Sequence, residues 1–151
     1  MSSSASRAQS THVTLEEPDV IYWHLVGDVS ADDIRAIYAI QMEFCGGKPY
    51  ALVLIDLSRM RSITPEARRA AAEGPTPGKQ VMPIRASAVI GASFHFRIIG
   101  TLVSKAAHFI NRTLDSPSKF FDNENEARAW FDERRLEIGT SSLRQEPTIH
   151  Q

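Results

Sequence analysis

Apolar runs of strand length alternate along this chain with segments whose apolar residues recur at helical spacing. The clearest run, residues 50–57, is apolar on both faces and ends in an acid and a turn. A strand is apolar on both faces when helices cover both sides of its sheet. Shorter runs predict further strands at 12–16, 20–26, 85–91 and 119–122. The turn Glu17-Pro18-Asp19 separates the first two of these, so we expect them to pair in antiparallel fashion.

Helix signals fill the intervals between these runs. Ser30 is a good cap for a helix that Gly46-Gly47 ends, and Thr64-Pro65 opens a short helix before Gly74. A long helix is expected at about 94–112, and Asn123 caps the last one. The order β-β-α-β-α-β-α-β-α predicts an α/β fold, a mixed sheet of about five strands with about four helices and parallel crossovers.

Composition sets the extent of the fold. The 151 residues, 42% hydrophobic and 23% charged, suffice for one domain with a core. Small and polar residues predict a disordered tail over 1–11 and a flexible tail over 138–151. One α/β domain is therefore expected at 12–137, without a linker or an internal repeat.

Charge and apolar run length exclude several classes of protein. A net charge of −1 gives no broad basic surface for nucleic acid. No apolar run approaches the roughly 20 residues of a membrane span, and the first residues lack the apolar region of a secretory signal. The single cysteine, Cys45, rules out an internal disulfide. We therefore expect a cytoplasmic protein.

No pattern of residues predicts a catalytic site, a metal site or a cofactor. The five histidines and Cys45 lack the spacing of metal ligands. His24, in an apolar strand, is expected to be a pocket or core residue with one satisfied nitrogen, and Cys45 to be a buried thiol. Gly91-Ala92-Ser93-Phe94 joins a strand to a helix as phosphate-binding turns do. It lacks the full glycine spacing of such turns, which favours a tight connector.

Polar residues that follow the central strand form the first candidate binding region. Asp56 ends that strand, where open α/β sheets place ligands, or it caps the loop from Ser58 to Thr64. Arginines gather around this loop together with Glu66. They form either a solvated face with helical ion pairs or a surface for an anion or an acidic partner. These arginines are Arg59, Arg61, Arg68 and Arg69.

The long helix carries the second candidate region. Apolar residues fill half of its circumference, more than the roughly 100° stripe that a surface helix needs. It is either a core helix between two neighbours, a homodimer face or the wall of a lipid pocket. We expect Phe94, Phe96 or Ile98 to contact a second chain, a lipid-like ligand or a cavity, unless the loop 74–83 covers them. The expected single core comprises Ile37, Leu52, Leu54, Val89, Leu102, Ala106, Trp130 and Phe131.

Three segments of the sequence resemble the STAS-like family of bacterial anti-sigma-factor antagonists. Val53-Leu54-Ile55-Asp56-Leu57-Ser58 is similar to the family's central strand and its exit, and Ala88-Val89-Ile90-Gly91 to its next strand. The segment from Phe120 to Trp130 is similar to its closing strand and helix. The resemblance spans about 12–135 and implies a STAS-like fold whose partners bind the edge near the second helix.

One departure from the family concerns its phosphorylation site. The family's regulatory branch has a kinase substrate serine near the start of the helix after the central strand, and Glu66 falls at that position here. The Asp-Ser-Ser-Gly signature is absent. We expect Ser58, Thr64 and Glu66 to lie together near that helix start, without phosphate. We expect Glu66 to interact favourably with the helix dipole there and to mimic a permanently charged state.

These observations predict a non-enzymatic regulatory or protein-interaction module. Its protein partner is unknown, and a second copy in a homodimer is one possibility. The alternative is a carrier of a small apolar molecule or lipid, with a cavity beside helix 94–112, since the architecture broadly resembles that of CRAL-TRIO lipid carriers. The candidate binding residues are Asp56, Ser58, Arg61, Thr64, Glu66, Arg69, Phe94, Phe96 and Ile98.

Overall fold

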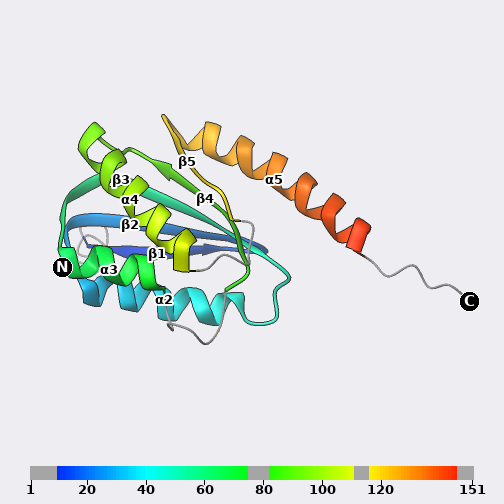
Figure 1. Ribbon diagram of the computed structural model, residues 1–151, viewed down its shortest axis with the longest axis horizontal. Coiled ribbons are helices and arrows are strands. Elements are labelled where there is room, and N and C mark those ends of the chain that lie inside the picture. Colours follow the sequence, from blue (N-terminus) through cyan, green and yellow to red (C-terminus); the bar gives the residue numbers. More distant parts are fainter. Residues whose placement is uncertain (1–9, 75–81, 111–115, 146–151) are drawn as a thin grey trace, which may run out of the picture.

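The computed structural model describes residues 10–74, 82–110 and 116–145 (Figure 1). Its elements confirm the predicted order of strands and helices. They are β1 (His12–Glu16), β2 (Val20–Val29), α2 (Ala31–Cys45), β3 (Ala51–Ile63), α3 (Pro65–Glu73), β4 (Ile84–Ile90), α4 (Phe94–Ile110), β5 (Ser118–Phe121) and α5 (Glu124–Gln145).

The strands form one mixed sheet in the order β1-β2-β3-β4-β5. β1 pairs with β2 in antiparallel fashion, and all the other neighbours are parallel, as the single-helix connections predicted. Figure 1 shows α5 on one side of the sheet and α2, α3 and α4 on the other. None of the described helices is both long and apolar enough to span a bilayer.

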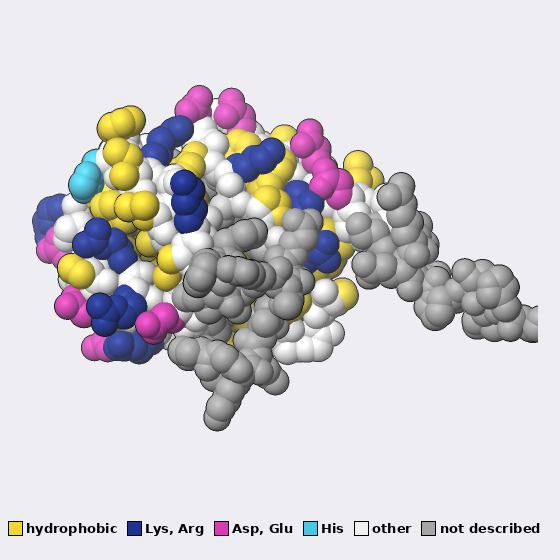
Figure 2. All heavy atoms as spheres, in the orientation of Figure 1, with side chains coloured by type: hydrophobic (Ala, Val, Ile, Leu, Met, Phe, Trp, Pro, Cys, Tyr) yellow, Lys and Arg dark blue, Asp and Glu magenta, His cyan; other side chains and the backbone are white. Residues whose placement is uncertain are grey.

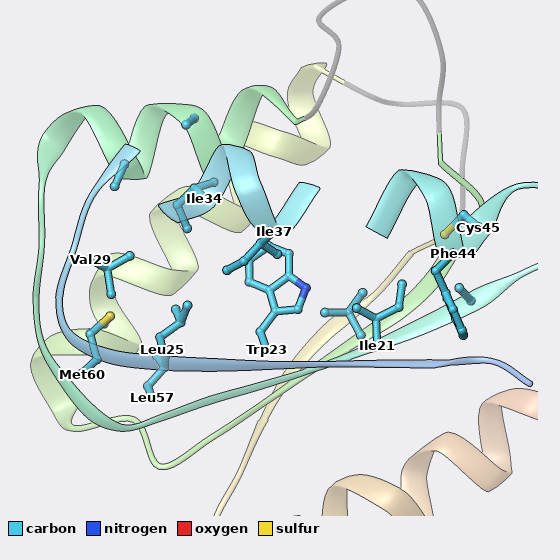
Figure 3. Close-up of a cluster of buried hydrophobic side chains, with 14 residues drawn as sticks. Ile21, Trp23, Leu25, Val29, Ile34, Ile37, Phe44, Cys45, Leu57 and Met60 are labelled. Atoms are coloured by element: carbon cyan, nitrogen blue, oxygen red, sulfur yellow. The ribbon is translucent and has the colours of Figure 1, made fainter. Parts of the chain in front are cut away.

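The sheet divides the interior into two cores. Alternate side chains of a strand point to opposite faces, so β2 sends Ile21 and Trp23 to one core and Tyr22 to the other. Figure 3 shows the first core, in which Trp23 reaches from β2 toward Ile37 of α2. The second core contains Leu54 and the inner side chains of α5, which are Ala127, Trp130, Phe131 and Ile138.

The expected single core is therefore wrong, although most of its members are buried. Ile37 lies on one side of the sheet, whereas Leu52, Leu54, Trp130 and Phe131 lie on the other. Val89 is partly buried and packs against the first core. Leu102 and Ala106 of α4 are exposed, because α4 turns a narrower stripe toward the sheet than its composition suggested.

Three predicted helix caps are confirmed. The Ser30 hydroxyl accepts a hydrogen bond from the backbone N–H of Asp33, and the Asp33 carboxylate accepts one from the Ser30 N–H, which completes a capping box. The Thr64 hydroxyl accepts from the Ala67 N–H at 3.0 Å. Asn123 Oδ1 accepts from the Glu126 N–H at 2.9 Å. These caps are local, which is why the sequence alone located the helix starts.

Two predicted boundaries are wrong. β3 continues to Ile63 through the expected loop, because it stays paired with β2 past two register shifts and still buries Met60. α5 continues to Gln145, so the flexible tail expected from residue 138 is helical in its first part. Burial of Ile138 against the sheet overrides the weak helix propensity of the residues that follow it. Most of the expected N-terminal tail and of the loop 74–83 lies outside the described residues.

Candidate functional site

Asp56 and Ser58 lie on β3 next to the end of β4. The Asp56 carboxylate accepts a hydrogen bond from the Ser58 backbone N–H at 2.8 Å, a local contact that supports the capping role of Asp56. Gly91 follows β4 with φ +70, and a Cβ there would lie 2.6 Å from the Cβ of Ser58. Only glycine lets these two backbone segments approach each other this closely. The close approach explains the glycine of the connector 91–94 without a phosphate.

Arg61 is engaged in an exposed ion pair. Its Nε and Nη2 donate to the two carboxylate oxygens of Asp28 at 3.0 and 2.6 Å, and the Ser62 hydroxyl donates to the same carboxylate at 2.7 Å. Arg61, and then Ser62, lower the pKa of Asp28 to about 2. Because this cluster ties β2 to β3, it is explained by the fold without a ligand.

Thr64 and Glu66 lie at the start of α3, but Ser58 does not join them. The extended segment of β3 that separates Ser58 from Thr64 spans about 20 Å at roughly 3.3 Å per residue. The expected cluster of the three is therefore wrong, because strand replaces the predicted loop. Glu66 is exposed in the first turn of α3. Arg69 lies on the same helix and lines a shallow groove toward α4.

A stack of rings on β1 and β2 was not predicted. The His24 ring lies 4.0 Å from that of Tyr22 and 4.4 Å from that of His12, measured between centroids. His24 is half-buried, and its Nε2 contacts the Thr14 hydroxyl at 3.1 Å, as expected for a satisfied histidine. Burial, and then His12, lower the pKa of His24. Among the described residues, no three His, Cys, Asp or Glu side chains are grouped so that they could hold a metal ion.

A cavity of about 300 Å³ lies between the sheet and the helices α2, α3 and α4, which cover one of its sides. Phe96 of α4 is one of its walls, whereas Phe94 and Ile98 are not. The other described side chains around it are mostly apolar, among them Leu25, Ile34, Tyr38, Val53, Ile55, Leu57, Met60, Ile63, Ile84, Val89, Ile99 and Val103. The volume is at the lower end for a small-molecule site.

Gln41 is the most deeply buried polar residue of this cavity, with 2% of its surface exposed. Its Oε1 accepts a hydrogen bond from Trp23 Nε1 at 2.9 Å, and its Nε2 donates to Met82 Sδ at 3.5 Å. The sequence carried a signal for this residue, since Gln41 is the one polar member of an otherwise apolar helix face. Such a residue is explained by a polar partner in the core.

The outer face of α4 presents a ridge of exposed apolar side chains. The exposed fractions of Phe94, Ile98 and Leu102 are 81%, 48% and 61%. The three recur every fourth residue and so share one side of the helix. Beside Leu102, the groove toward α3 is also lined by Arg68 and Arg69. Figure 2 shows hydrophobic and basic side chains interspersed on this face of the molecule. We call Phe94, Ile98 and Leu102 the α4 ridge.

The family model and one solved structure indicate the same fold. The family described as SpoIIAA-like matches residues 20–132. An uncharacterized protein of the DUF3478 family from Shewanella loihica PV-4, with a SpoIIAA-like fold, is 16% identical, with a TM-score of 0.53 over 80% of this chain and 91% of that one. The anti-sigma factor antagonist SpoIIAA in its unphosphorylated form is 12% identical, with a TM-score of 0.49 over 83% of this chain and 98% of that one. No curated protein matches.

Proposed function

This chain belongs to the SpoIIAA-like family, and from that premise we propose that it is a regulatory domain that binds a protein partner and catalyses no reaction. The α4 ridge is the observation that carries the proposal. Large apolar side chains that gather on one exposed face usually mark an interaction site. The family supports a regulatory domain, and the ridge supplies a surface through which such a domain can act.

The charge beside the ridge indicates the kind of partner. Arg68 and Arg69 line the groove next to Leu102, and Lys105 is exposed one turn of α4 further on. Such a surface complements a segment that carries both apolar and acidic side chains. Glu73, the last residue of α3, also lines the groove and would repel acidic groups. The acidic groups of the partner are therefore expected to lie beside Arg68 and Arg69, away from Glu73.

We expect a photo-crosslinking amino acid at Leu102 to give a defined covalent adduct in cells of the native host. The adduct should weaken when Arg68 and Arg69 are both changed to glutamate, because the acidic side of the partner is then repelled. Denaturing gels and mass spectrometry of the adduct provide the measurement. An adduct at twice the mass of the chain would identify the partner as a second copy.

A label at Leu136 is the matched control for this experiment. Leu136 is 74% exposed on α5, on the opposite side of the sheet from α4. The protein-binding proposal fails if Leu102 gives no adduct, or if Leu136 gives the same set of adducts as Leu102.

The cavity favours a second candidate function, binding of a small apolar molecule. Its walls are contributed by α2, α3, α4 and the central strands, so a bound molecule would contact the same helix that carries the ridge. Occupancy of the cavity and presentation of the ridge would then be linked through α4. A ligand can shift the equilibrium between two arrangements of α4 only by binding one of them better than the other.

Naphthalene tests this second function, because its rigid apolar ring system is small enough for the cavity. We expect the purified protein to bind it in isothermal titration calorimetry, and the variant Val89→Phe to lose at least tenfold in affinity, because the added ring occupies cavity space. Leu15→Phe adds similar bulk at an exposed residue of β1 and should bind like the wild type. Equal binding by Val89→Phe and the wild type would show that naphthalene does not enter the cavity.

A further inference from the structure

The polar side chains of the cavity are not spread evenly over its walls. Ser87 of β4 is the register partner of Ser118 of β5, and Ser116 lies just before β5. α4 crosses back from the end of β4 toward the start of β5, so its later turns, which carry Ser104, lie over the starts of these strands. All four serines line the cavity. They therefore gather at the end of the cavity near the starts of β4 and β5.

The opposite end of the cavity is apolar. Leu57 and Met60 come from the far part of β3, and Phe96 comes from the first turn of α4. The cavity is thus polarised along α4, with an apolar end at the beginning of the helix and a hydroxyl-rich end toward its later turns. A molecule that fits both ends has an apolar body and a polar head.

The serine hydroxyls at this end are available to such a head, and Ser87 and Ser104 offer two of them from β4 and α4. Within the described part of the chain, the hydroxyls of Ser87 and Ser104 have no hydrogen-bond partner. Ser104 differs in this from Thr101 and Thr140, whose hydroxyls donate to the backbone carbonyl one turn earlier at 2.8 and 2.9 Å. Both serines are partly buried, so a bound ligand would displace little solvent in reaching them.

The charge of the walls restricts the head further. Glu73 is the one charged residue among the described side chains that line the cavity. A carboxylate or phosphate head would find no cation among these side chains and would be repelled by Glu73. A neutral hydroxyl or carbonyl head needs no counter-ion and can accept or donate hydrogen bonds with serine.

We propose that the cavity binds an uncharged amphiphile, with its apolar body between β3 and the start of α4 and its hydroxyl or carbonyl head hydrogen-bonded to Ser87 and Ser104. This inference rests on the second candidate function and names the chemical class of its ligand. The family's regulatory role does not enter the argument, which depends on the arrangement of side chains in this chain.

Three probes with one ring system test the inference: naphthalene, 2-naphthol and 2-naphthoate, titrated calorimetrically into the full chain at pH 7.5. The double variant Ser87→Ala/Ser104→Ala should weaken the binding of 2-naphthol about tenfold, since both hydrogen bonds to its hydroxyl are removed. It should leave naphthalene within about twofold of the wild type, because naphthalene has no head. The wild type should bind 2-naphthoate at least tenfold more weakly than 2-naphthol.

Ser62→Ala is the matched control, because Ser62 lies on β3 outside the cavity. Thermal unfolding of each variant checks that the fold is retained. Binding of naphthalene with no effect of the double variant on 2-naphthol would overturn the proposed head site and leave the apolar cavity function standing. Tighter binding of 2-naphthoate than of 2-naphthol would overturn the uncharged head. Binding of none of the three probes would defeat the cavity function itself, and the inference with it.

Discussion

Replacing Trp130 with alanine is expected to lower the free energy of unfolding by about 3–5 kcal/mol. Trp130 lies on the inner face of α5 and is 6% exposed. Its ring lies 5.4 Å from that of Phe121 and 6.0 Å from that of Phe131, between centroids. α5 is the described helix that covers this face of the sheet, so no neighbouring helix can close the resulting cavity.

Leu136→Ala provides the comparison on the same helix. Leu136 is exposed, so its loss should change the free energy of unfolding by less than about 0.5 kcal/mol. Urea titrations followed by circular dichroism measure both variants against the wild type. A loss below about 1 kcal/mol for Trp130→Ala would show that α5 does not depend on this packing.

Asp19→Asn is expected to cost about 2–3 kcal/mol at neutral pH. The Asp19 carboxylate is buried and accepts hydrogen bonds from Nε and Nη2 of Arg135 at 2.7 and 3.0 Å. It also accepts one from the Tyr50 hydroxyl at 2.7 Å. An amide of the same shape places its N–H groups against these donors and removes the charge that Arg135 requires. This cost is set below the ~3–5 kcal/mol of a fully buried pair, because the side chain of Arg135 is 34% exposed.

The cost of Asp19→Asn should depend on pH. Burial alone would raise the pKa of Asp19, but the hydrogen bonds from Arg135 and Tyr50 outweigh it and hold the pKa below its ordinary value. A carboxylate with a lowered folded pKa stabilises the fold above its unfolded pKa, near 4, and loses that contribution as the pH falls through the folded pKa. The difference between Asp19→Asn and the wild type should therefore shrink as the pH falls below about 4.

Asp32→Asn is the control for this pair of predictions. Asp32 pairs with Arg35 one turn away on α2, and the Asp32 side chain is 95% exposed. Exposed pairs of this kind contribute little, so the change should stay within about 0.5 kcal/mol at every pH. Denaturant titrations at several pH values compare the two variants. A constant cost of Asp19→Asn between pH 7 and pH 3 would contradict the proposed ionic link.

Local signals along the chain were sufficient for the elements and their order. Ser30, Thr64 and Asn123 cap their helices through contacts within three residues, and these caps lie where the sequence placed them. The parallel crossovers follow from strands that alternate with single helices. A capping bond or a hydrophobic period needs only near neighbours, so each can be recognised without knowledge of the rest of the fold.

The candidate sites depended on contacts between distant segments, and here the sequence predictions were less successful. Phe96 lines the cavity, and Arg69 lines the groove beside the α4 ridge. Ser58 proved to be separated from Thr64 by strand, because pairing with β2 extended β3. Ser87 and Ser104 were not singled out, since a serine in a strand or a helix has no local feature that marks it as part of a cavity wall.

The pattern of apolar and polar residues alone was enough to predict the α/β class, the strand order along the chain and the helix starts. Which apolar residues of α4 would be buried was decided by the packing of that helix on the sheet, which turns Phe96 inward and leaves Phe94, Ile98 and Leu102 outside. The physical reason is that periodicity shows only that one side of a helix is apolar. How much of that side is covered depends on the distance and angle at which α3 and the sheet approach it, and these are set by residues far away in the chain.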